Sequence, residues 1–287
     1  MKTIALFVSA ALLLSLPLVA VDGVTLINQS TVNAAGGFPY LINQPGSYRL
    51  SSDLIVPNTA AIGLFLQNAT VTLDLNGFTI SCASCTAKGN FGIGIFVQGS
   101  IATILNGTIT GFAAQSATAS GIFVQATSSA VQAKINQVTV TNNRFGILGG
   151  VGSDVSVTDC TVSQNLDDGV NLQVTGKVLN SSILFNGIQG IHIFNGLISG
   201  NHIFGNGNGT PDPNFTGQPG GIVADNTVTV TNNSIVGNNQ FGLFGNAGGS
   251  NHPLIGFGSN TFGQNAVDVA GSGTVSFKNN ASSSGLF

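Results

Sequence analysis

Apolar and polar residues alternate in short stretches along the chain from residue 24 onward. Examples are "ATVTLDL" at 69–75, "DVSVTDCTV" at 154–162, "GVNLQV" at 169–174 and "TVTVTNNSIV" at 227–236. Alternation with a period of two predicts β-strands, and the Asn, Gly and Ser residues between the stretches are typical of turns. No segment in this part of the chain has the period of an amphipathic helix. The pattern therefore predicts an all-β fold made of short strands.

Two independent features show that these strands belong to a repeated unit. One is a glycine followed by an aliphatic residue, at Gly94, Gly121, Gly146, Gly169, Gly190, Gly221 and Gly242. The other is Thr, Ser or His followed by an apolar residue, at Thr79, Thr108, Thr139, Thr161, Ser182, His202, Ser234 and Thr261. A unit of about 20 to 30 residues that contains only strands and turns predicts the coils of a parallel β-helix, about eight to ten of them. A β-sandwich also has many short strands, but it gives no reason for both features to recur in the same order.

Stacked coils place equivalent residues above one another, so the repeats predict ladders inside the helix. The first aliphatic ladder is expected to contain Ile95, Ile122, Ile147, Val170, Ile191, Ile222 and Leu243. The second is expected to contain Ile80, Ile109, Val140, Val162, Ile183, Ile203, Ile235 and Phe262. Asparagines stand four residues before several of the glycines, at Asn90, Asn142, Asn165, Asn186 and Asn238. Stacked asparagines can hydrogen-bond along their column.

The N-terminus predicts a secretory signal peptide over residues 1–23. Lys2 precedes an apolar run from Ile4 to Ala20, and small residues follow. A membrane anchor is the alternative, which the shortness of the run and Pro17 disfavour. Residues 24–50 are expected to cap the first coil, and residues 51–287 to form the β-helix. No later segment is apolar enough to span a bilayer, so the expected location is secreted, periplasmic or at the cell surface.

Charge is scarce in the chain. Charged residues make up 6% and hydrophobic residues 43%, and no basic patch exists that would favour a nucleic-acid partner. In a secreted protein, Cys82 and Cys85 predict a local disulfide, because a zinc site would need two further ligands nearby. Cys160 is expected to be buried and unpaired.

Two segments near the N-terminus resemble a known class of proteins. The stretches "GFPYLINQPGSYRLSSDL" (37–54) and "NATVTLDLNGFTIS" (68–81) are similar to the opening coils of secreted, mostly bacterial, right-handed β-helix proteins. The later coils, with Asn four residues before Gly-Ile, resemble the repeats shared by pectate lyases, polygalacturonases and their relatives. The resemblance covers nearly the whole chain after the signal peptide and implies a right-handed parallel β-helix of the pectate lyase-like superfamily. It implies little about activity, because the repeat encodes stacking and not chemistry.

The best candidate site surrounds the adjacent carboxylates Asp167 and Asp168. Aligning the coils by their glycines places Arg144 one coil before the pair and His192 one coil after it. Two carboxylates close together can hold different pKa values, as glycoside hydrolysis requires. These four residues are the candidate catalytic residues. The alternative is structural, because Asp-Gly favours a turn in which Arg144 and Asp167 would form a surface ion pair.

The pair resembles polygalacturonase-type hydrolases in one element only. The stretch "NLDDGVNL" is similar to their Asn-x-Asp-Asp segment, but "NNRFG" lacks the aspartate expected one coil earlier and Gln189 replaces the histidine expected one coil later. The Arg-Ile-Lys segment of that family is absent. A lyase would need a calcium cluster and a base, and the only acids close in sequence are Asp154, Asp159, Asp167 and Asp168. No cofactor is predicted beyond a single calcium ion, which this set leaves open.

Four further residues are candidates for binding a substrate: Asn171, Gln173, Phe96 and Phe123. Residues two positions after the repeat glycines should point outward, where aromatic rings can stack on sugars or dock a partner. The segment 205–221 lengthens one coil, either as the wall of a substrate groove or as a tolerated insertion. The Thr-Ile-Thr steps form a hydroxyl ladder that resembles the face of ice-binding β-helices, although threonine pairs also stabilise ordinary sheets.

The sequence therefore predicts a secreted β-helix that binds extended polysaccharide or a cell-surface glycan. The alternatives are a polysaccharide hydrolase or lyase of the pectin-degrading type, and a structural, adhesive or ice-binding surface protein. The residues leave open whether the protein is an enzyme, and they leave open its oligomeric state.

Overall fold

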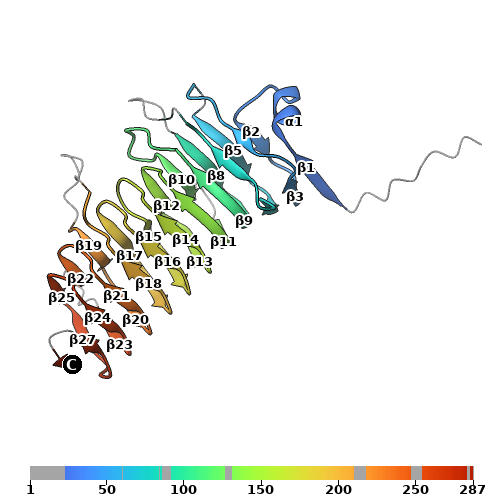
Figure 1. Cartoon of the computed structure of the whole chain (residues 1–287). Helices are drawn as coiled ribbons and strands as arrows, with labels where there is room; N and C mark the ends of the chain where they lie inside the picture. The colour runs from blue at the N-terminus through green and yellow to red at the C-terminus, as the bar shows by residue number, and fades with distance from the viewer. Residues whose placement is uncertain are drawn as a thin grey trace, which may run out of the picture.

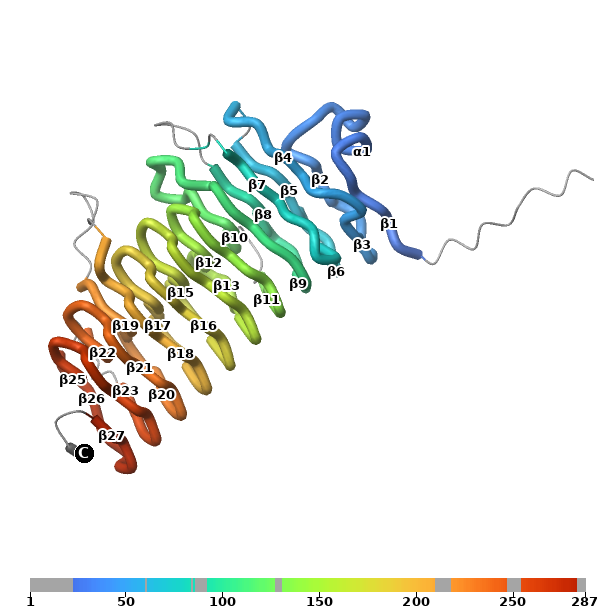
Figure 2. Tube along the Cα trace, viewed as in Figure 1, coloured from blue at the N-terminus to red at the C-terminus, as the bar shows by residue number. Residues whose placement is uncertain are grey.

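Short strands follow one another around a long axis, and each coil of the chain lies against the next (Figure 1). The computed structural model describes residues 23–59, 61–83, 85, 92–126, 131–209, 218–246, 254–282 and 285–286. The tube in Figure 2 shows that the coils succeed one another in sequence order, so the two ends of the described chain lie at opposite ends of the stack. The predicted parallel β-helix is confirmed.

The strands form three parallel stacks, A, B and C, one strand of each per coil. Stack A contains β2 (Tyr40–Ile42), β5 (Ile62–Gln67), β8 (Ile93–Gln98), β10 (Ser120–Gln125), β12 (Phe145–Gly149), the first parts of β15 (Val170–Leu179) and β17 (Gln189–Ser199), β19 (Gly220–Ala224), β22 (Phe241–Gly245) and β25 (Val267–Gly271). Stack B contains β1 (Val24–Ile27), β3 (Gly46–Leu50), β6 (Thr70–Asp74), the first parts of β9 (Ile101–Thr110) and β11 (Val131–Thr141), β13 (Ser153–Thr158), the second parts of β15 and β17, β20 (Val228–Thr231), β23 (Ile255–Gly258) and β26 (Thr274–Ser276). Stack C contains β4 (Leu54–Ile55), β7 (Thr79–Ser81), the second parts of β9 and β11, β14 (Thr161–Ser163), β16 (Ser182–Leu184), β18 (His202–Phe204), β21 (Ser234–Val236), β24 (Thr261–Gly263) and β27 (Ala281–Ser282), with β28 (Gly285–Leu286) antiparallel to β27.

The N-terminal end differs from the sequence prediction in two ways. A short helix, α1 (Gln29–Ala34), forms where no helix was expected, because Asn28 caps it by accepting a hydrogen bond from the Thr31 backbone N–H and Val32 is buried. Six residues are too few to show a helical period in the sequence. The strands β2 and β3 already pair with β5 and β6, so coil stacking begins inside the segment expected to be a cap. The predicted signal peptide lies outside the described residues, except for Gly23.

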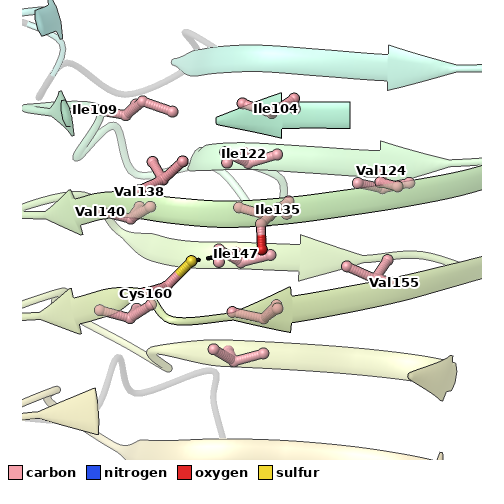
Figure 3. Packing of buried hydrophobic residues seen from close by; sticks show 14 of the residues in the cluster. Ile104, Ile109, Ile122, Val124, Ile135, Val138, Val140, Ile147, Val155 and Cys160 are labelled. Carbon is pink, nitrogen blue, oxygen red and sulfur yellow. Dashed lines mark hydrogen bonds between the residues drawn. The ribbon is translucent and has the colours of Figure 1, made fainter. Parts of the chain in front are cut away.

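Both predicted aliphatic ladders are present, in the predicted register. Stack A carries the first ladder and stack C carries the second, and every member is at most 2% exposed. Figure 3 shows Ile122 and Ile147 of one ladder facing the same interior as Ile109 and Val140 of the other. Neighbouring coils in register are about 4.8 Å apart, so each side chain packs on its equivalent in the next coil. Dispersion and hydrophobic burial along these ladders hold the coils together.

The repeat glycines are explained by the same close stacking. At Gly190, an added Cβ would lie 2.7 Å from the carbonyl oxygen of Gly221 in the next coil, and Gly169 and Gly221 meet the next glycine in the same way at 2.7 Å. None of these three glycines has a positive φ. These glycines therefore leave room for the backbone of the neighbouring coil, and any side chain at their positions would push the coils apart.

Buried asparagines form a hydrogen-bonded ladder at the corner between stacks C and A. In each member except the last, the backbone N–H and the Nδ2 both donate to Oδ1 of the asparagine in the next coil; the members are Asn143, Asn165, Asn186, Asn206, Asn238 and Asn265. The prediction of Asn142 was wrong by one residue. Asn142 has a φ of 55° and makes the left-handed turn that places Asn143 inside. Asn90 lies outside the described residues.

A second ladder, which the sequence analysis did not find, occupies the corner between stacks B and C. Its asparagines are Asn201, Asn233, Asn260 and Asn280, joined by the same pair of bonds. Cys160 and Ser181 stand at the equivalent positions of the two coils before them, each directly after a residue with positive φ. The Cys160 thiol donates to the Ile135 carbonyl of the preceding coil, 3.6 Å away, as the asparagine amides do elsewhere (Figure 3).

The cysteine predictions are confirmed. Cys82 and Cys85 form a disulfide, and Cys160 is a buried free thiol whose pKa burial raises. Within the described residues, no helix is long and apolar enough to cross a membrane.

Candidate functional site

The outward side chains of stack A include two rows that run along the helix axis. The inner row is paired residue by residue and consists of Leu41, Phe65, Phe96, Phe123, Leu148, Asn171, His192, Val223, Phe244 and Ala270. The outer row lies two positions later on eight of these strands, each time directly after an inward residue that is paired with the neighbouring coil. Its members are Gln67, Gln98, Gln125, Gly150, Gln173, Phe194, Asp225 and Asn246. The predicted outward column is therefore confirmed as the inner row.

The aromatic part of the inner row is covered. Phe96 and Phe123 stack with ring centroids 5.2 Å apart, and they are 9% and 6% exposed. Together with Ile93, Phe145 and Leu148 they form a second apolar cluster outside the helix interior. The expectation that Phe96 and Phe123 offer exposed rings to a substrate is wrong, because each ring face is occupied by a neighbouring coil.

The predicted pairing of Arg144 with Asp167 is confirmed, but it is not a surface ion pair. The Arg144 Nε lies 2.7 Å from Asp167 Oδ2, with the two side chains 12% and 5% exposed. Asp167 lies at the bend before β15. Its backbone N–H also donates to the Arg144 carbonyl, so a backbone bond and a side-chain ion pair join the same two residues. A buried ion pair of this geometry joins two neighbouring coils, and it leaves Asp167 occupied by its partner.

Asp168 is fully buried and hydrogen-bonded on both carboxylate oxygens. The Gln189 backbone N–H donates to Oδ1 at 3.2 Å, and Asn171 Nδ2 donates to Oδ2 at 2.7 Å. Desolvation by burial raises the pKa of Asp168 to about 6, although the charge of His192 and the bond from Asn171 oppose this shift. The carboxylate is therefore held inside the protein, out of contact with solvent.

His192 and Asp225 extend this network across two more coils. His192 Nε2 donates to Asp225 Oδ2 at 2.7 Å, and Asn246 Nδ2 donates to Asp225 Oδ1 at 3.0 Å. Asn171 Nδ2 also lies 3.4 Å from His192 Nδ1, which accepts this contact in the neutral ring. Burial lowers the pKa of His192, but the bond to Asp225 and the charges of Asp168 and Asp225 outweigh it and raise the pKa above its ordinary value. Burial alone would raise the pKa of Asp225, but the hydrogen bond with His192 and the charge of His192 lower it below its ordinary value.

The network has little capacity for acid–base chemistry on an external substrate. Both ring nitrogens of His192 have protein partners, and so do both oxygens of Asp168 and of Asp225. Two buried acceptors, Asn171 Oδ1 and Gln189 Oε1, have no partner in the described part of the chain. Among the described residues, no three His, Cys, Asp or Glu side chains lie close enough together to hold a metal ion.

The outer-row side chains are exposed to solvent on the coils where the inner-row side chains are buried. Gln67, Gln98 and Gln125 are paired in register on three successive coils and are partly exposed. Among the described residues, their amide groups have no hydrogen-bond partner. Two coils further, Gln173 is exposed, and Phe194 beyond it is 41% exposed. The row thus presents unoccupied amides followed by an accessible aromatic ring.

Of the predicted site residues, the structure joins Asp168, Asn171 and His192 into one network and places Arg144 with Asp167 beside it. Gln173 alone among the predicted binding residues is well exposed. Sequence reasoning missed Asp225, Asn246 and Phe194. Counting two residues beyond each inner-row position would have found the outer row, because side chains on a strand return to the same face after two residues.

Unfolding measurements at several pH values test the buried carboxylate. The free energy of unfolding should fall as the pH rises from about 4 to about 7, because the pKa of Asp168 is about 6 in the folded protein and 3.8 ordinarily. Between these values the folded state keeps a proton that the unfolded chain has lost, which amounts to a loss on the order of 3 kcal/mol. The raised pKa of His192 acts in the same direction, whereas the lowered pKa of Asp225 matters only in stronger acid.

The matched variant is Asp168→Asn, which is uncharged at every pH. Its melting temperature should depend less on pH between 4 and 7 than that of the wild type. Identical slopes for the two proteins would show that Asp168 ionises normally in the fold.

The fold and this arrangement define a right-handed parallel β-helix with a polar outer face on one side. The sequence matches the family described as "Right handed beta helix region" over residues 52–212, more than half of the chain, and the protein belongs to that family. Among solved structures it is similar to the crystal structure of pectate lyase Pel9A, with 17% identity, a TM-score of 0.56, and coverage of 89% of this chain and 70% of that one. At this identity the likeness shows the fold alone. No curated protein matches the chain.

Proposed function

We propose that the protein is secreted and binds an extended polysaccharide along the outer row of stack A. The observation that carries the proposal is the register of Gln67, Gln98 and Gln125, whose amides are partly exposed and lack partners among the described residues. An amide offers two donors and one acceptor, the combination that sugar hydroxyls use. These amides differ from the buried asparagine amides at the corners of the helix, which are paired with one another.

The geometry of the row suits a linear ligand. One outer-row position per coil, at about 4.8 Å intervals, extends over eight coils and so spans on the order of 30 Å along the axis. Phe194 lies on the coil between those of Gln173 and Asp225, where the register of β15 against β17 shifts after Leu172, and its exposed ring can stack on the apolar face of a sugar. A polymer lying along the axis would contact the amides and the ring at once.

Binding is tested by affinity electrophoresis and calorimetry with a panel of plant and microbial polysaccharides. The double variant Gln98→Ala/Gln125→Ala should weaken binding of the preferred polymer about tenfold, because each lost amide contributes about 0.5–1.5 kcal/mol. The control is Gln132→Ala, an exposed glutamine on stack B, which should bind as the wild type does. Equal weakening by the two variants, or no binding to any polymer, would rule the proposal out.

We propose binding without cleavage by the aspartate pair. Asp167 is paired with Arg144 and Asp168 is enclosed, so neither is placed to reach a glycosidic bond. The bound polymer should release neither reducing ends nor unsaturated products in a long incubation. Release by the wild type that disappears in Asp168→Asn would establish the pair as catalytic instead.

A further inference from the structure

We propose that the polysaccharide held by the outer row is uncharged, in contrast to the acidic polymer in the name of the structurally similar pectate lyase. This inference rests on the proposed binding function and specifies its ligand class. It follows from the charges that stack A presents and from the partners that each of them has.

In the part of the chain that the structure describes, each cation on the outer surface of stack A is already paired with a carboxylate. In the described chain, its two basic side chains are Arg144 and His192, and each lies 2.7 Å from a carboxylate, Asp167 and Asp225 respectively. Recognition of a carboxylate normally uses a charge-assisted bond from Arg or Lys. A uronate would therefore have to break one of these pairs, which leaves a buried carboxylate without its partner.

The net charge of the face also disfavours an anion. The polar network holds the three carboxylates of Asp167, Asp168 and Asp225 against the two bases, Arg144 and His192, and Asp268 lies on β25 of the same stack. At pH 7, above the pKa of Asp168 of about 6, the balance of this network is negative whether His192 is protonated or neutral, so a polyanion would meet repulsion at these coils.

The other basic residues in the described structure lie elsewhere. Lys134 and Lys177 are on stack B, Arg49 pairs with Asp74 at 3.1 Å on stack B, His202 begins β18 of stack C, and Lys278 follows β26 near the C-terminal end. An acidic polymer would find more basic side chains on stack B than on stack A. The open amides and the exposed Phe194 are on stack A, and neither needs a charge on the ligand.

The test compares polymers that differ in charge and share a backbone type. Hydroxyethylcellulose is paired with carboxymethylcellulose, and mannan with mannuronate-rich alginate. Dissociation constants are measured by calorimetry and affinity electrophoresis at 20 and 300 mM salt. We expect at least one neutral polymer to bind ten times or more tightly than its acidic counterpart, with no loss at high salt and with weakening in Gln98→Ala/Gln125→Ala.

A gain-of-charge variant provides a positive control for the surface. Gln98→Lys/Gln125→Lys adds two cations to the outer row and should acquire salt-sensitive binding of the acidic polymers. Its circular dichroism and melting temperature, compared with those of the wild type, verify that it folds.

The outcomes separate this inference from the function on which it rests. Tighter binding of an acidic polymer by the wild type, lost in Gln98→Ala/Gln125→Ala, would overturn the uncharged ligand and keep the binding function. Binding of an acidic polymer that only Lys134→Ala or Lys177→Ala weakens would move the site to stack B and overturn both. No binding of any polymer would overturn the binding function.

Discussion

Replacing Asn206 by alanine should lower the free energy of unfolding by about 3 kcal/mol or more. Its Oδ1 accepts bonds from the backbone N–H and the Nδ2 of Asn186, both at 3.0 Å, and its own Nδ2 donates to the Ile183 carbonyl at 3.0 Å. Truncation removes these three bonds and the bond from Asn206 Nδ2 to Asn238 Oδ1, although Asn186 Nδ2 keeps its bond to the Val162 carbonyl. Each buried group that is left without a partner costs about 1–3 kcal/mol. Thermal and urea unfolding measure the loss.

The control for this variant is Asn208→Ala, two residues later. Asn208 is exposed, and within the described part of the chain its side chain makes one bond, to the Gly205 carbonyl. This change should alter the unfolding free energy by less than about 0.5 kcal/mol. Similar losses in the two variants would mean that the ladder bonds add nothing to stability beyond that of a surface amide.

Replacing Gly190 by alanine should destabilise the protein by about 2 to 3 kcal/mol. The new Cβ would lie 2.7 Å from the Gly221 carbonyl oxygen and 2.9 Å from Asn206 Nδ2, so the neighbouring coil and the asparagine ladder would both have to shift. The melting temperature and the urea midpoint should fall together.

Gly263→Ala is the matched control, because the nearest atom to a Cβ there is Val236 Cγ1 at 4.0 Å. Its φ is not positive either, so alanine fits the backbone. This variant should be neutral or slightly more stable, since alanine restricts the unfolded chain. A tolerated Gly190→Ala would show that the coils can separate locally at little cost.

The interior of the helix could be predicted from the sequence because stacking repeats the same environment in every coil. Ile122 and Ile147 are 25 residues apart, yet each faces the same interior, so the repeat alone identified both. The asparagine ladder was predicted one residue out of place at Asn142. A short sequence motif does not reveal that the corner uses one left-handed residue before the chain turns inward at Asn143.

The candidate site was harder to predict because it does not repeat. His192 was aligned correctly with Asn171, but its strongest partner is Asp225, which follows β19 and is separated from His192 by the lengthened coil. Burial of the inner row was not foreseen either. Whether Phe96 is covered depends on packing by neighbours such as Phe123 and Phe145 outside the helix, and the repeat pattern gives no information about this.

The asparagine ladders determine which coils unfold most easily. Each asparagine takes its acceptor from the coil that follows, so removing the last coil leaves the remaining coils with the bonds they already share. Removing an inner coil, in contrast, interrupts both ladders and both aliphatic columns at once. Unfolding of a terminal coil therefore costs less free energy than unfolding of an inner coil. The polar network of Asp168 and His192 lies on inner coils, where local opening is rarest.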